Sequence, residues 1–342
     1  MNKLTFLLVL LFPFSLCAQI GGEKAFSFID IETSPRIEAM GGNLIAVVDD
    51  DVSLSQTTPS LLNEQMSGQL AFNFVDYFTD INAVSVHYAN RLKHIGIYSI
   101  GIDAYNYGTF NLTDATANEL GTFTANDQVI TLGLSKELNN NFFLGTNVRL
   151  LNSNYERYYS SALGVNISTT YFHAEKHFTA TFLVKNLGRQ LISYTSVKEL
   201  LPYNVLLGLS KELKHLPFRY SLTFVHLNQF DIKSPYKLTS QTNIETGELE
   251  IKEESIAKTA LRHLIIGGEL NPFRKSLFIR AGFNFQRRFD LSLSSYPAMI
   301  GFSWGIGFKM SKFQLNYSRS VYHLSGVTNN FGIAANLSTF GL

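Results

Sequence analysis

The sequence predicts an all-β protein, a transmembrane antiparallel β-barrel of about 14 strands with an N-terminal plug segment. Three observations support this fold class. The chain opens with a short apolar leader, it is poor in charge but rich in aromatic residues, and from Gln69 onward it alternates apolar and polar residues between turn signals. Charged residues make up 16% of the chain, where about a quarter is usual, and aromatic residues make up 13%.

Residues 1–18 are predicted to be a signal peptide that is removed. Lys3 supplies a positive start, and the apolar run 4–16 is shorter than the roughly 20 residues that a membrane-spanning helix requires. Cleavage is expected after Ala18. The alternative, a lipoprotein that begins at Cys17, needs a small residue before the cysteine, where this chain has Leu16. Since Cys17 is the only cysteine, the mature chain is expected to have no disulfide and no Cys-ligated metal.

Composition narrows the class of protein further. The chain has 28 Lys and Arg against 27 Asp and Glu, a formal charge of +1, so no strong field marks nucleic acid as a partner. No segment after the leader approaches 18 uninterrupted apolar residues. An exported chain of this composition is either a soluble periplasmic β-protein or a membrane barrel, and the strand pattern has to decide.

Residues 19–66 are predicted to form the plug and residues 67–342 the barrel. The first part lacks sustained alternation and carries Gly41-Gly42, the acidic run 49–51 and Thr58-Pro59-Ser60. In the second part, the clearest alternation runs over 298–310, with one apolar face and one small or polar face. Leu277, Ile279, Ala281, Phe283 and Phe285 alternate in the same way. A tilted membrane strand needs about 9 to 11 residues, which favours the membrane reading over a sandwich.

Connection lengths give an independent test, because outer-membrane barrels have short periplasmic turns and longer outer loops. Short links follow the even-numbered predicted strands, at 90–94, 139–141, 173–176, 214–216, 271–275 and 311. Longer links follow odd-numbered strands, at 108–126, 188–202, 229–259, 289–297 and 323–328, with short exceptions at 78–81 and 157–159. An even count of strands places both ends of the barrel on the periplasmic side. The glutamate-rich link 229–259 is expected to be exposed to solvent.

The motifs with possible chemistry have simpler interpretations. Gly301 to Gly305 matches the G-x-S-x-G pattern, but it lies inside a predicted strand with no helix after it, so Ser303 is expected to be a small inward residue. His173 and His177 are expected to be ordinary turn residues. No catalytic residue, metal ligand or cofactor is therefore predicted. For the inward Arg149, Arg280 and Lys309 two roles stay open: lining a conduction path, or pairing with carboxylates inside a plugged barrel.

A calcium site is a further possibility for the acidic run 49–51. A loop-type calcium site spaces its ligands at alternate positions and ends with a bidentate glutamate, which this run does not do. A capping or solvated acidic turn is expected instead.

The N-terminal block resembles the start of FadL-related outer-membrane barrels, a family that includes PorV of the type IX secretion system. The blocks are Met40-Gly-Gly-Asn, Ala46-Val-Val-Asp-Asp and Thr58-Pro-Ser, and the resemblance implies structural roles for Gly41, Gly42, Asp49, Asp50 and Pro59. The family usually has Asn-Pro-Ala where this chain has Thr58-Pro59-Ser60, a departure that argues against fatty-acid transport.

A fuller similarity is to the PorQ family of type IX secretion proteins. It rests on the order of several blocks: Asp49-Asp-Asp-Val, Leu61-Leu-Asn-Glu, Phe74-Val-Asp-Tyr-Phe-Thr-Asp-Ile-Asn, Val184-Lys-Asn-Leu-Gly, Pro217-Phe-Arg-Tyr-Ser-Leu, Phe285-Gln-Arg-Arg and Tyr322-His-Leu-Ser-Gly. The similarity implies a non-enzymatic anchor of the attachment complex, which holds a PorZ-like protein beside PorU and PorV for cargo attachment to surface lipopolysaccharide. The alternative is a FadL-like channel for hydrophobic solutes.

Overall fold

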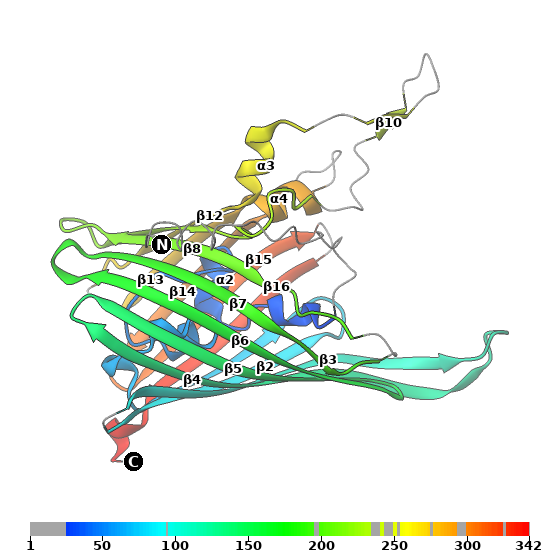
Figure 1. Ribbon diagram of the computed structural model, residues 1–342, viewed down its shortest axis with the longest axis horizontal. Coiled ribbons are helices and arrows are strands. Elements are labelled where there is room, and N and C mark those ends of the chain that lie inside the picture. Colours follow the sequence, from blue (N-terminus) through cyan, green and yellow to red (C-terminus); the bar gives the residue numbers. More distant parts are fainter. Residues whose placement is uncertain are drawn as a thin grey trace, which may run out of the picture.

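The computed structural model describes residues 25–341 except 94, 195–197, 234–239, 243–248, 252–253, 274–275, 293–298 and 324–325. Fourteen strands form a closed antiparallel barrel in the order β1-β16-β15-β14-β13-β12-β9-β8-β7-β6-β5-β4-β3-β2 (Figure 1). Pairing of Gln69 with Asn336 begins the β1–β16 ladder that closes it. The predicted fold class is confirmed. The predicted signal peptide lies outside the described residues.

The barrel strands have these bounds: β1 Gln69–Asp76, β2 Asn82–Leu92, β3 Gly96–Thr113, β4 Glu119–Asn139, β5 Phe142–Tyr155, β6 Tyr158–His173, β7 Phe178–Ile192, β8 Asn204–Glu212, β9 Phe218–Phe224, β12 Leu264–Leu270, β13 Leu277–Asn284, β14 Phe302–Met310, β15 Phe313–His323 and β16 Gly326–Asn336. A separate two-stranded sheet pairs β10 (Ser240–Thr242) with β11 (Leu249–Ile251).

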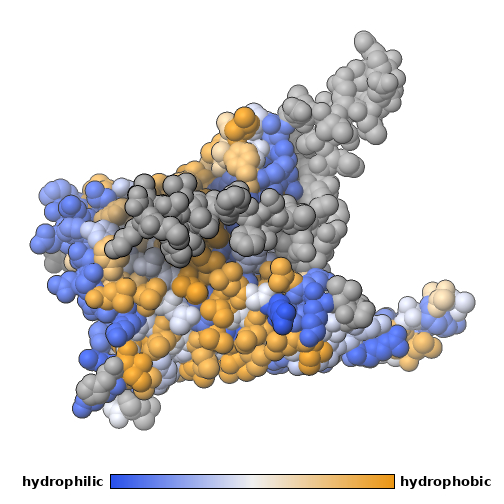
Figure 2. All heavy atoms as spheres, in the orientation of Figure 1, coloured by the Kyte–Doolittle hydropathy of each residue, from blue (hydrophilic) through white to orange (hydrophobic). Residues whose placement is uncertain are grey.

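The barrel wall is apolar outside and polar inside. On β5, Val148 and Leu150 point outward and are 44% and 38% exposed, whereas Asn147 and Arg149 point inward and are buried. Figure 2 shows the outer surface of one face, with apolar side chains over the middle of the strands and hydrophilic ones at the short-turn end. An exposed apolar band of this extent is costly in water and is stable in lipid, as expected of an outer-membrane barrel. Among the described residues, no helix is long and apolar enough to span a membrane.

The two ends of the barrel differ in their connections. Turns of a few residues join β4 to β5, β8 to β9 and β14 to β15 at one end, which also holds the start of β1 and the end of β16. Longer connections join β7 to β8, β9 to β12 and β13 to β14 at the other end. By the rule for outer-membrane barrels, the long-connection end faces outward.

Three predicted loops and strands need correction. The predicted link 108–126 continues the β3–β4 ladder out to the pair Thr113 and Glu119, so a long hairpin projects beyond the barrel (Figure 1). The predicted link 229–259 contains the β10–β11 sheet and leads into helix α3 (Ile256–Arg262). Ser255 caps that helix by accepting from the Lys258 backbone N–H, a local signal that the charge-based prediction did not use.

The third correction concerns the strands that flank the 285–301 connection. β13 ends at Asn284, because its side chain accepts from the Arg287 backbone N–H and starts helix α4 (Phe285–Leu291). β14 begins only at Phe302, since Gly301 turns the chain at a φ of +85°. Ile300, predicted to lie on the apolar outer face, is fully buried instead. Ala298 lies outside the described residues.

The segment before the barrel fills the lumen. It contains η1 (Ser27–Asp30), α2 (Pro35–Ala39), η2 (Val52–Gln56), η3 (Pro59–Leu61) and η4 (Glu64–Met66). Helix α2 packs against β13 to β16, and η3 packs against β4 to β6 on the opposite wall. Short capped turns suit this position, because the side chains of Ser34, Asp51 and Asn63 satisfy backbone N–H groups at the starts of α2, η2 and η4.

Candidate functional site

A buried ion network fastens the plug to the wall. Arg36 of the plug donates to Asp49 (Nη2 to Oδ2, 2.7 Å) and to Glu269 of β12 (Nη2 to Oε1, 3.0 Å). Arg280 of β13 donates to the other oxygen of Glu269 (Nε to Oε2, 2.7 Å), and Arg219 of β9 also reaches Glu269 (3.0 Å). With Asp51 and, at its more exposed edge, Glu212 (Arg219 Nη2 to Oε2, 2.9 Å), the network sets three guanidinium groups against four carboxylates. Removing one partner from such a group costs about 3–5 kcal/mol, because it strands a buried charge.

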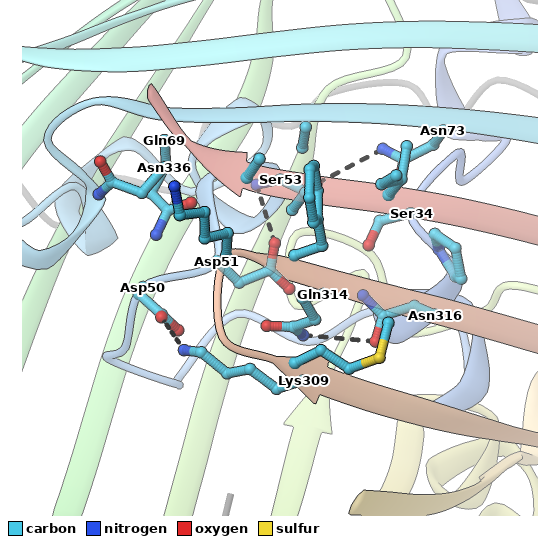
Figure 3. Close-up of a pocket in the computed structure, with 18 of the residues that line it drawn as sticks. Ser34, Asp50, Asp51, Ser53, Gln69, Asn73, Lys309, Gln314, Asn316 and Asn336 are labelled. Atoms are coloured by element: carbon cyan, nitrogen blue, oxygen red, sulfur yellow. Dashed lines mark hydrogen bonds and ion pairs between the residues drawn. The ribbon is translucent and has the colours of Figure 1, made fainter. Parts of the chain in front are cut away.

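The ion network keeps Asp49 of the plug ionised. Burial disfavours the charged form of Asp49, but Arg36 and Arg219 outweigh burial and lower the pKa of this carboxyl. The next residue, Asp50, accepts from Lys309 of β14. Figure 3 shows this pair and the Asp51 bond to Ser53 beside a cavity of about 70 Å³ at the short-turn end.

The open question about the inward cations is thereby answered for two of them. Arg280 and Lys309 pair with carboxylates of β12 and the plug, and Arg149 donates to the Asn186 side chain (2.7 Å). The arrangement is that of a plugged barrel. Glu269 and Arg219, the wall members at the centre of the network, were not singled out from the sequence. The signal was available, since Ile265, Gly267 and Glu269 alternate inward on β12.

The two family-motif glycines lie where the plug turns against the wall. Gly41 and Gly42 have φ values of +99° and +89°, and their N–H groups donate to Glu38 and Ile37 to end α2. A β-carbon on Gly41 would clash with Ile265, and one on Gly42 would clash with Arg287, which pairs with Glu38 (2.6 Å). Glycine is required here both for the left-handed backbone and for the close approach.

Pro59 and its neighbour Ser60 make the equivalent contact on the opposite wall. Pro59 starts the η3 turn, and the Ser60 backbone N–H donates to Ser168 of β6 (2.8 Å). Gly145 of β5 leaves room for this backbone, because a β-carbon there would clash with Pro59 and Ser60.

An apolar collar lines one side of the lumen at its outer end. It consists of inward side chains of β1 to β6 and one loop residue: Val75, Ala83, Tyr105, Val129, Leu151, Ala162 and Leu201. One inward step deeper, the strands carry polar residues, among them Asn73, Ser85, Asp103, Thr131 and Arg149. The collar is thus an apolar arc on the β1–β6 side of the lumen, with polar residues directly beneath it.

The chain's own aromatic residues occupy the collar. Phe26 and Phe28 are both 5% exposed, with ring centroids 5.9 Å apart, and the Phe28 ring meets Tyr105 edge-on at 5.2 Å. Phe26 adopts a left-handed backbone at φ 61°, a conformation that costs a bulky residue about 1–3 kcal/mol. The sequence pattern does not mark these two residues, because they precede the alternating region and look like any apolar pair.

A small polar cavity of about 40 Å³ lies beneath the collar, between the plug and β2, β3 and β5. Its lining includes Glu32, His87 and Asp103, with His87 Nε2 and Asp103 Oδ1 3.0 Å apart. Burial raises the pKa of Glu32 to about 8, although the Ser34 backbone N–H favours its charged form. This volume is enough for water and far below the roughly 300 Å³ of ordinary ligand pockets.

The other residues with possible chemistry have structural partners. The buried Ser303 hydroxyl donates to the Ala39 carbonyl (3.1 Å) and so joins β14 to the plug. His173 ends β6, and His177 occupies a left-handed position (φ 48°) in the turn to β7. Within the described part of the chain, no three His, Cys, Asp or Glu side chains gather in a way that could hold a metal ion.

The fold and the filled lumen define a class: a plugged, 14-stranded outer-membrane β-barrel. No protein-family model and no curated protein matches the sequence. Among solved structures, the chain is similar to a deltaS2S3 mutant of TodX, named as a monoaromatic hydrocarbon channel, at 12% identity and a TM-score of 0.50, covering 90% of this chain and 100% of that one.

Two further solved structures are similar to the chain. The Pseudomonas putida toluene transporter TodX has 12% identity and a TM-score of 0.49, covering 90% of this chain and 97% of its own. A Pseudomonas aeruginosa FadL homologue has 12% identity and a TM-score of 0.48, covering 89% and 98%. None of the three is named as an enzyme. At such identities, the TodX mutant supports the fold assignment and nothing finer.

Proposed function

We propose that this chain is an outer-membrane conduit for small hydrophobic solutes, with an entry site at the apolar collar that Phe26 and Phe28 close. The observation that carries the proposal is the collar itself, an apolar arc at the outer mouth with polar residues beneath it. The fold likeness to barrels named for toluene and monoaromatic hydrocarbons agrees with this solute class.

The occupied collar supports a gate rather than an open pore. Two cavities elsewhere in the lumen, of about 70 and 40 Å³, are too small for a solute the size of toluene. A solute must therefore replace the Phe26 and Phe28 rings. The left-handed backbone of Phe26 lowers the cost of that exchange, because withdrawal of the segment relieves its strain.

Binding of fluorotoluene, followed by fluorine NMR on the purified barrel, tests the proposal. Phe28→Ala should tighten binding about tenfold, since an empty apolar cavity accepts an aromatic hydrocarbon. Leu151→Asn should abolish binding, because it places an amide in the collar. Leu150→Ala is the matched control, as the adjacent residue of β5 faces lipid. Equal binding by all three variants would rule out the collar as the solute site.

A second candidate function is a docking scaffold for a secretion partner, and the projecting β3–β4 hairpin favours it. This hairpin extends past the barrel on the outer side (Figure 1) and carries the exposed Phe110 and Leu120. Phe110 stacks on Phe123 across the ladder at 5.3 Å. Together with the similarity to PorQ proteins, this supports an anchor role toward a PorZ-like protein, with PorU and PorV in the same complex.

A detergent pull-down from native membranes separates the two functions. As an anchor, the full chain should retain a PorZ-like protein, and a variant with residues 109–124 replaced by a two-residue turn should lose it. As a conduit, that variant should still bind fluorotoluene. Full retention of the partner by the shortened variant would contradict the anchor role.

A further inference from the structure

The lipid-facing wall carries a hollow over β1, β14, β15 and β16. It has a volume of about 390 Å³, within the range of ordinary ligand pockets. Gly332 and Asn316 form part of its floor. The large outward side chains that line it are Phe72, Phe74, Ile306, Phe308, Leu315, Tyr317, Phe331 and Ile333. A hollow on this face is separate from the lumen and from the collar.

A polar row borders the hollow on its outer side. Strand register places Trp304, Arg319, Asn329 and Asp76 side by side across β14, β15, β16 and β1. Arg319 is exposed on the outer face of the wall and donates from Nη1 to Asn329 (3.2 Å), which also accepts from the Tyr317 hydroxyl (3.0 Å). The bond to Asn329 uses only one of the five N–H donors of the Arg319 guanidinium, so further acceptors can bind there.

Aromatic contacts mark this row as the boundary between lipid and water. Trp304 meets Tyr317 edge-on at 5.7 Å, and Tyr317 meets Phe331 at 5.2 Å. Outward aromatic residues form girdles at the two surfaces of a membrane barrel, with an apolar band between them. An outward arginine at that level lies at the depth of lipid headgroups.

We infer that the hollow and Arg319 together form a binding site for a phosphorylated lipid of the outer leaflet. An acyl chain would fill the hollow, and the lipid phosphate would accept from Arg319. The carboxylate of Asp76, two strands away beyond Asn329, repels an anion. The phosphate therefore lies on the Trp304 side of Arg319.

The single tryptophan of the chain makes the site measurable. Trp304 is the register partner of Arg319, and no other tryptophan contributes to the fluorescence. In vesicles, brominated phosphatidylglycerol and brominated phosphatidylcholine are compared as quenchers at equal mole fraction. The anionic lipid should bind about fivefold more tightly, the effect of one basic residue near a charged membrane surface.

Three variants and one competitor sharpen the test. Arg319→Gln should remove the preference, and Asp76→Asn should increase it, a gain that a merely structural role would not produce. Arg91→Gln is the matched control, as it removes an exposed charge at the opposite end of the barrel. Free inorganic phosphate should not compete. Equal quenching by the two lipids, an unchanged Arg319→Gln variant, or competition by free phosphate would each overturn the inference.

Discussion

At the residue scale, the structure depends on side chains that stand opposite one another across the plug–wall boundary. Glu269 is the clearest example, since it faces Arg36, Arg219 and Arg280 at once. The sequence of β12 alone does not predict that Glu269 pairs with three guanidinium groups. The partners come from β9, β13 and the plug, and only closure of the barrel brings them together.

Replacing Glu269 with glutamine should destabilise the barrel by about 3–5 kcal/mol, because Arg36, Arg219 and Arg280 would each lose a buried carboxylate partner. Urea titration of the protein folded into vesicles measures this change. Glu64→Gln is the control, since the Glu64 pair with Arg91 is mostly exposed and contributes at most about 1 kcal/mol. A similar loss in both variants would show that the network does not stabilise the fold.

Glu32 should make stability depend on pH. Its pKa rises from 4.5 to about 8 on folding, so the folded state binds more protons between these values. Stability should therefore fall as the pH rises from about 4.5 to about 8, and Glu32→Gln should weaken this dependence. Unfolding midpoints at pH 5, 7 and 9 give the comparison. If the wild-type unfolding midpoint rises from pH 5 to pH 9 and Glu32→Gln removes that rise, the assignment is contradicted.

At the element scale, the plug divides into a fixed core and a closing segment. The core is held on two walls by α2 and η3, whereas the segment 25–30 contributes Phe26 and Phe28 to the collar. The proposed gate requires movement of the segment alone.

A cross-link between the plug core and the wall tests this division. The Ala46 β-carbon lies 3.1 Å from the position of a β-carbon on Gly208 of β8, slightly inside the roughly 3.5–4.5 Å between the β-carbons of a disulfide, and the Ile45 side chain, 2.5 Å from that position, must move aside. Ala46→Cys with Gly208→Cys should therefore form a disulfide and leave fluorotoluene binding unchanged. If oxidation abolishes binding and reduction restores it, the whole plug moves and the proposed gate is wrong.

Gly41 provides a test of the plug–wall contact. Gly41→Ala combines a left-handed backbone with a clash against Ile265, so the free energy of unfolding should fall by more than about 1 kcal/mol. Gly121→Ala is matched in backbone sign (φ +147°) but has open space around it, so its loss should be smaller. Heat-dependent gel mobility compares the two. Equal losses would mean that backbone strain alone matters.

At the scale of the whole molecule, sequence periodicity was enough to predict the barrel but not the arrangement of the residues inside it. Outward Val148 and Leu150 alternate with inward Asn147 and Arg149, and that pattern predicts both the strand and the face that meets lipid. The β3–β4 hairpin escaped prediction because outside the membrane both faces of its strands are solvated and alternation fades. The collar escaped prediction because Phe28 and its wall partner Tyr105 lie far apart in the sequence, and only the fold brings them together.

The central claim, that the barrel's apolar face meets lipid and its polar face the plug, is tested most directly by the fluorescence of Trp304. This sole tryptophan is 41% exposed and points outward from β14. In vesicles, lipids brominated along their acyl chains should quench it strongly, and aqueous acrylamide should quench it weakly. Strong quenching by acrylamide with little effect of brominated lipid would contradict the account.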